Sequence, residues 1–212
     1  MFPDILQKAG FKKEVLLFFE NSFFSDSLGR ALFPYKSNGN AEDIEILCPE
    51  AHRVPKTAEI WEAGGEITAL VRRVYVFSSA INAIAFFYFY PGKLRQPEHV
   101  AVASLGLVPC KLQVQYLDGK YPNAEVCAVF DNDILGRVAD CKLALWLKGK
   151  DAAFMYEAEI LKISYQGRLY QISQADFSLF NFQKQTGLRL GVRTYKPGKY
   201  HNSFYILFIH SI

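Results

Sequence analysis

Three short apolar runs, separated by segments of helix-like composition, constrain the fold of this 212-residue chain most strongly. The runs are residues 74–77, 99–103 and 126–130, and the segments between and after them are residues 80–90, 111–117 and 134–147. Strands that are apolar at every position are buried on both faces, which is typical of parallel strands connected by helices. We therefore predict an α/β fold with a compact parallel sheet of about four strands and helices on both faces.

The residues before this core predict a helical start and an antiparallel hairpin. The first thirty residues have helical, apolar character, and residues 31–36 and 44–48 have strand-like patterns around the turn signal Ser37-Asn38-Gly39-Asn40. Residues 49–66, which contain two prolines and a Gly-Gly pair, are expected to form a connector. We assign residues 1–70 to this N-terminal extension and residues 71–150 to the α/β core.

The residues after the core predict a second antiparallel addition, spanning 151–212. Residues 158–164 and 168–172 flank Tyr165-Gln166-Gly167, which indicates a hairpin. Residues 188–195 and 204–209 are expected to form further strands around Pro197-Gly198.

Composition excludes several classes of protein. Half of the residues are hydrophobic, which excludes a disordered chain. The most apolar stretch, residues 80–90, is about half as long as a membrane span, and the N-terminus lacks the pattern of a secretory signal, so we expect no membrane partner. The four cysteines are far apart and have no histidine at zinc-ligand spacing. We therefore expect reduced thiols, no structural zinc and a cytoplasmic location.

Positive charge gathers at the end of the chain. After Asp176 there are five basic residues and no acidic residue, although the whole chain has a net charge of only +3. Arg193, Lys196 and Lys199 are interleaved with tyrosines, a combination that binds phosphates and stacks on bases. The alternative is a solvated edge hairpin whose lysines discourage pairing with other strands.

Two carboxylates follow the third apolar run. Asp131 and Asp133 lie two residues apart where the predicted strand ends, and carboxylates so placed suit Mg²⁺. The alternative is that Asp133 caps the helix that begins at Ile134, with Asp131 favoured by the helix dipole. Arg137 could contact a phosphate, or it could pair with Asp133 or Asp140 on the helix.

These segments together resemble the Toprim (topoisomerase–primase) domain of bacterial primases, topoisomerases and mobile-element proteins. The match consists of the strand at residues 74–77, Ala103-Ser104-Leu105-Gly106, and Phe130-Asp131-Asn132-Asp133-x-x-Gly136-Arg137, in that order within residues 71–150. The resemblance implies a Toprim-like sheet and a Mg²⁺ site at Asp131 and Asp133. It also implies nucleic acid, or a DNA-processing complex, as the partner.

The sequence departs from the Toprim pattern at two positions. The family places a Glu directly after the first strand and commonly an Asp a few residues later. This chain has Ser78 at the Glu position, or Ser79 in a one-residue shift, and Asn82 at the Asp position. In the family the Glu is thought to act as general acid or base, and serine cannot replace a carboxylate in proton transfer. The resemblance therefore implies a degenerate member with a weakened Mg²⁺ site and without the family's catalysis.

Three functions stay open from the sequence. The first is a nucleic-acid-associated protein of primase or mobilisation type, resembling proteins of bacterial mobile elements, that binds through Arg137, Arg193, Lys196 and Lys199. The second is a Mg²⁺-dependent nuclease or nucleotidyl transferase in which Glu125 or Asp118 fills the vacant carboxylate position. The third is a protein-interaction module that has kept only the fold.

Overall fold

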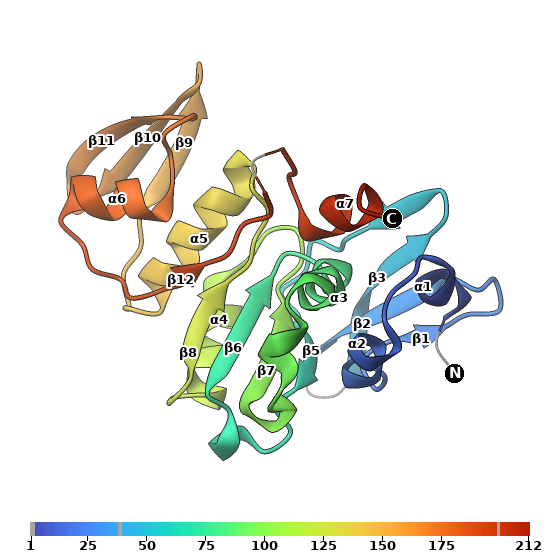
Figure 1. Ribbon diagram of the computed structural model, residues 1–212. Coiled ribbons are helices and arrows are strands. Elements are labelled where there is room, and N and C mark those ends of the chain that lie inside the picture. The colour runs from blue at the N-terminus through green and yellow to red at the C-terminus, as the bar shows by residue number, and fades with distance from the viewer. Residues whose placement is uncertain (1–2, 38–39, 199) are drawn as a thin grey trace.

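A mixed sheet of five strands forms the centre of the structure, in the order β12-β8-β6-β7-β5 (Figure 1). The computed structural model describes residues 3–37, 40–198 and 200–212. β12, β8, β6 and β7 are parallel neighbours, and β5 pairs antiparallel with β7. The predicted α/β class is therefore confirmed, with one antiparallel strand added. The strands are β5 (Trp61–Gly64), β6 (Arg73–Phe77), β7 (Val100–Ser104), β8 (Glu125–Ala128) and β12 (Arg193–Thr194).

Helices cover both faces of this sheet (Figure 1). α3 (Ala80–Phe89) packs on one face with Tyr75 and Phe77 of β6. α4 (Lys111–Lys120) and α5 (Ile134–Trp146) pack on the other face, against Val74 and Val76. Alternate residues of β6 thus enter different cores, which explains why this run is apolar at each position from Val74 to Phe77. Three short 3-10 helices precede β6 and β7: η1 (Thr68–Leu70), η2 (Pro91–Leu94) and η3 (Pro97–His99).

The N-terminal part forms two short helices and an antiparallel sheet in the order β1-β2-β3-β4. The predicted hairpin is confirmed as β2 and β3, although Asn38 and Gly39 of its turn lie outside the described residues. The predicted connector over residues 49–66 was wrong, because it contains β4 and β5, and β5 belongs to the central sheet. The elements are α1 (Asp4–Lys8), α2 (Lys13–Phe18), β1 (Phe24–Ser25), β2 (Ala31–Ser37), β3 (Asn40–Cys48) and β4 (Ala51–Arg53).

The segment after residue 150 begins with an antiparallel sheet in the order β11-β10-β9. The predicted hairpin is confirmed by β10 and β11, and Gln166 and Gly167 between them both have positive φ, as a tight hairpin turn requires. This small sheet packs with α6 around its own apolar cluster. The elements are β9 (Ala153–Glu157), β10 (Ile160–Tyr165), β11 (Arg168–Ser173) and α6 (Leu179–Thr186).

The last predicted strand was wrong, because residues 204–209 form the helix α7 (Phe204–Ile209). Ser203 caps the helix by accepting a hydrogen bond from the Ile206 amide, and Phe204 and Phe208, one helical turn apart, are both buried. Phe208 stacks on Phe11 with ring centroids 3.9 Å apart. Of the strand predicted over residues 188–195, only β12 forms, and it pairs parallel with β8.

Candidate functional site

Asp131 and Asp133 line one pocket, of about 300 Å³, together with Ser78 and Asn82. Ser78 directly follows β6, and Asp131 lies three residues beyond β8. Because β6 and β8 are parallel neighbours, their carboxyl ends meet at the same edge of the sheet, which is where α/β proteins gather their ligands. The structure thus brings both aspartates, Ser78 and Asn82 together at this edge of the sheet.

Ser78 and Asn82 hold the Asp131 carboxylate directly. The Ser78 hydroxyl donates to Oδ2 at 3.1 Å, and the Asn82 amide nitrogen donates to Oδ1 at 3.0 Å. Burial raises the pKa of Asp131 to about 6, against the hydrogen bond from Ser78, which lowers it. Ser78 and Asn82 therefore both supply hydrogen bonds to the carboxylate of Asp131.

Asp133 caps a helix. Its Oδ1 accepts a hydrogen bond from the Gly136 amide at 2.7 Å, so the alternative raised for this residue is confirmed as one of its roles. Gly136 is required there because a Cβ would overlap the backbone oxygen of Asp131. The Gly of the predicted motif thus lets the first turn of α5 approach the strand exit closely.

The donor atoms in the pocket do not fit a tight Mg²⁺ site. Both oxygens of Asp131 accept hydrogen bonds, and one oxygen of Asp133 is engaged by the helix. In residues 3–37, 40–198 and 200–212, no group of three or more His, Cys, Asp or Glu side chains could hold a metal ion. A cation bound here would have to displace hydrogen bonds or share a ligand with the helix cap.

The side chain of Lys196, which we predicted to bind nucleic acid, instead binds groups of the protein itself. Its Nζ donates to the backbone oxygens of Phe130 and Asp131, each at 2.9 Å, and lies 2.7 Å from Oδ2 of Asp140. Burial raises the pKa of Asp140 to about 6, although the charge of Lys196 opposes the shift. Lys196 therefore fastens the segment after β12 to the strand exit that carries Asp131.

The other predicted basic residues lie in different surroundings. Arg137 donates to the backbone oxygens of Gln174 and Phe177, at 3.3 and 3.0 Å, and so ties α5 to the loop before α6. Arg193 is exposed on β12. Lys199 lies outside the described residues. The structure therefore places Lys196 against the backbone of Asp131 and leaves Arg193 exposed on β12.

Sequence reasoning missed a buried acid beside the pocket. Glu45 of β3 is fully buried and accepts four hydrogen bonds, from Tyr35, His52, and the backbone amides of Ala80 and Ile81 at the start of α3. The His52 contact, at 2.8 Å, links this acid to a ring that lines the same pocket as Asp131.

The alternation of β3 did not reveal this acid. Glu45 and Leu47 share the buried face of the strand, whereas the apolar Ile44 and Ile46, which the pattern places inward, lie on the more exposed face. An inward carboxylate requires partners, which here are the Tyr35 hydroxyl, the His52 ring and the first amides of α3.

No family model matches this chain, and no curated protein matches it. In the part of the chain that the structure describes, every helix is too short or too polar to cross a membrane.

Proposed function

We propose that the chain is a Toprim-like nucleic-acid-associated protein of primase or mobilisation type, with impaired catalysis. The observation that carries the proposal is the single pocket shared by Asp131, Asp133, Ser78 and Asn82 at the carboxyl ends of parallel strands. Four residues from two sequence motifs meet there, in the places that the family resemblance assigns to its acidic site. Any parallel sheet brings the ends of neighbouring strands together, so the support beyond the fold comes from the residue types, namely Asp131 and Asp133 with Gly136 and Arg137 at the family's spacing.

The impairment follows from the charge of the pocket. A Toprim-like site with Ser78 and Asn82 has lost its acid–base carboxylate and one metal ligand, so the family's strand cleavage or polymerisation cannot proceed in the usual way. The two carboxylates suggested as replacements for the missing one, Glu125 and Asp118, give no support to an active nuclease. Glu125 begins β8, at the opposite end of the strand from Asp131, and Asp118 lies on α4.

Binding to nucleic acid tests this proposal. We expect the purified protein to retain labelled single- or double-stranded DNA, with affinity falling about tenfold or more between about 50 and 200 mM salt. The measurement is fluorescence anisotropy across a salt series, without added divalent metal. An absence of salt-dependent binding to every nucleic acid tried would refute the proposal and favour a protein-interaction module.

The weakened cation site gives a second expectation. We expect Mn²⁺, used as a probe for Mg²⁺, to bind the protein only in the millimolar range, and Ser78→Glu to tighten binding by at least about tenfold, because it adds a charge beside Asp131. Calorimetric titration measures both. The double variant Ser78→Glu, Asp131→Ala is the control and should lose the gain. Tight binding by the wild type, or no gain in Ser78→Glu, would contradict the expectation.

A further inference from the structure

A basic and aromatic surface lies on the central sheet away from the pocket. The strand register pairs Tyr75 and Arg193 with Cys127 and pairs Arg73 with Glu125, which places these five side chains on one face. Tyr75 and Cys127 belong to the cluster that packs under α3, so this is the α3 side of the sheet. Figure 1 shows α3 in front of β7, with β8 beside the helix rather than under it.

A lysine at the end of α3 completes this surface. Lys93, on η2, donates to the Tyr195 hydroxyl at 3.1 Å, and its Nζ lies 4.6 Å from the centre of the Tyr195 ring. The same ammonium lies 5.9 Å from the Tyr90 ring, which is 40% exposed. One cation is thus held among tyrosines, two of which, Tyr90 and Tyr195, are accessible to solvent.

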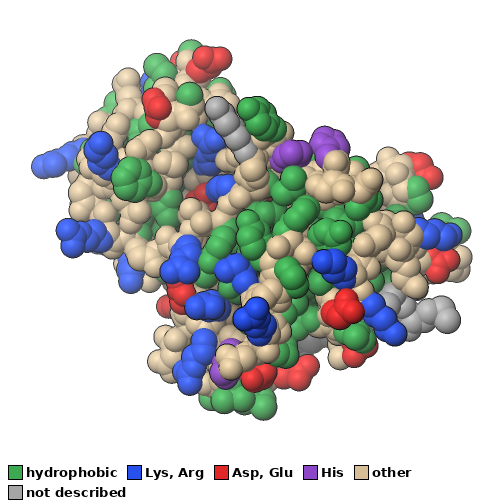
Figure 2. Space-filling view, viewed as in Figure 1, with side chains coloured by type: hydrophobic (Ala, Val, Ile, Leu, Met, Phe, Trp, Pro, Cys, Tyr) green, Lys and Arg blue, Asp and Glu red, His purple; other side chains and the backbone are tan. Residues whose placement is uncertain are grey.

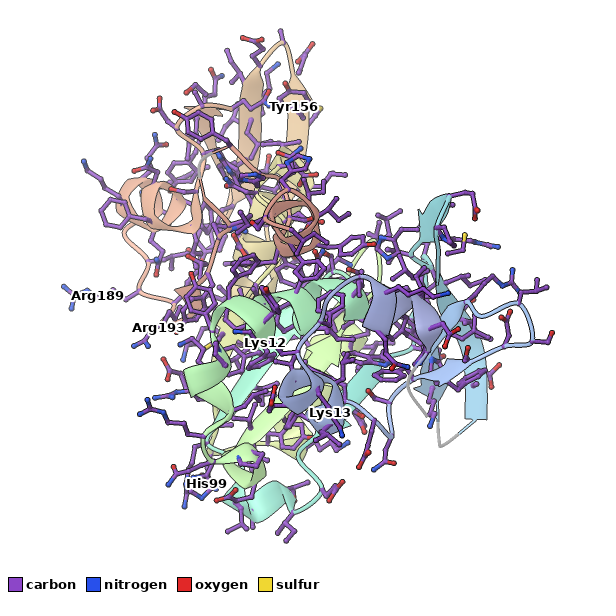
Figure 3. All side chains as sticks on the ribbon, turned by 45° about the vertical axis from the view of Figure 1, so that its right-hand side comes forward. Lys12, Lys13, His99, Tyr156, Arg189 and Arg193 are labelled. Carbon is purple, nitrogen blue, oxygen red and sulfur yellow. The ribbon has the colours of Figure 1, made fainter. Side chains whose placement is uncertain are left out.

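The charge of this surface is positive. Arg73 and Arg193 both lie near Glu125, with N–O distances of 3.3 and 3.5 Å. With Lys93 the surface carries three cations and one carboxylate, Glu125, so its charge is positive. Figure 2 shows Lys and Arg side chains gathered over β6 and β8. In Figure 3, Arg193 and Arg189 both extend outward from the same side of the molecule. We call Arg73, Lys93, Arg193, Tyr90 and Tyr195 the basic–aromatic face.

We propose that the basic–aromatic face binds single-stranded nucleic acid. This inference rests on the proposed function for the class of partner. It adds the location of the binding surface and the preference for a single strand. Arg73, Lys93 and Arg193 contact phosphates, and the exposed side of Tyr90 stacks on a base. Stacking requires an unpaired base, whereas a duplex offers only its backbone to such a surface, so the tyrosines favour a single strand.

Charge reversal on this face is the first test. We expect Arg193→Glu to weaken binding of a fluorescent oligothymidylate by about tenfold or more at low salt and to reduce the slope of log affinity against log salt by about 0.7, the value for one phosphate contact on a single strand. Lys13→Glu is the matched control, since it makes the same change in net charge on α2, where Figure 3 places Lys13 away from Arg193. Equal weakening by the two variants would overturn the proposal.

Removal of the exposed ring is the second test. We expect Tyr90→Ala to weaken oligothymidylate binding by about fivefold or more, the lower end for loss of one stacked base, and to leave the salt slope unchanged. Binding of a duplex of the same length should change less than twofold. Thermal unfolding of each variant, and Tyr90→Phe, which keeps the ring, separate lost contact from lost folding. A Tyr90→Phe variant as weak as Tyr90→Ala would overturn the stacking role.

The outcomes separate this inference from the proposed function. A wild-type protein that binds no nucleic acid removes both. A wild type that binds while Arg193→Glu and Tyr90→Ala behave as the wild type removes the basic–aromatic face and leaves the proposed function standing. A wild type that prefers duplex overturns the single-strand assignment alone.

Discussion

Replacement of Glu45 by alanine should lower the free energy of unfolding by about 3 to 5 kcal/mol, the largest loss that we expect from a single substitution near the pocket. The variant leaves the Tyr35 hydroxyl, the His52 ring and two backbone amides of α3 without their acceptor. The Glu45 carboxylate is fully buried, so the Tyr35 hydroxyl and the two backbone amides lose their acceptor at a place shielded from bulk water. Urea unfolding at neutral pH measures the loss.

Two controls separate the hydrogen bonds from the loss of a charge. Glu45→Gln keeps one acceptor oxygen and the side-chain volume, so it should cost less than Glu45→Ala. Glu42→Ala removes an exposed acid from the same strand and should change the free energy of unfolding by less than about 0.5 kcal/mol. A Glu45→Ala variant within about 1 kcal/mol of the wild type would show that the network does not fasten α3 to the N-terminal sheet.

The central elements could be predicted because their signals are local. The run at residues 74–77 is apolar at each position, as a strand between two helix layers must be, and Ser79 and Asp133 cap the helices that follow β6 and β8. The aspartates of the pocket came from a motif whose spacing fixes where they fall on the sheet edge. Sequence alone thus placed β6, β7 and β8, the helices α3, α4 and α5, and the two aspartates at the strand exit.

Other elements depend on partners that the sequence does not show. Residues 204–209 are apolar on all sides, so a strand and a buried helix have the same pattern, and contacts of Phe204 and Phe208 with the core decide for the helix. β5 is short and ends in glycine, and it forms because β7 offers an open edge. The sequence around Lys196 is typical of a surface lysine, whereas in the structure this side chain pairs with Asp140. Tertiary contacts decide each of these cases.

The negative charge of Asp131 should lower the free energy of unfolding, and the variant Asp131→Asn should recover the stability that this charge costs. Burial raises the pKa of this carboxyl from 3.8 to about 6. The folded protein therefore binds the proton more tightly than the unfolded chain, so the contribution of Asp131 to stability is complete below about pH 4 and is lost as the pH rises through 6. At pH 8 we expect Asp131→Asn to be more stable than the wild type by about 1 to 3 kcal/mol.

The pH dependence identifies the cause of this gain. The advantage of Asp131→Asn should shrink as the pH falls toward 4, where the wild-type carboxyl is neutral in both states. Asp133→Asn is the matched control, because asparagine also caps helices and Asp133 is exposed, so it should change stability little at either pH. Urea unfolding at both pH values measures the difference. A gain of equal size at pH 4 and pH 8 would contradict the electrostatic cause. A chain that keeps a largely buried carboxylate against its own stability is expected to use that charge, so a measured gain in Asp131→Asn would support a binding role for the pocket.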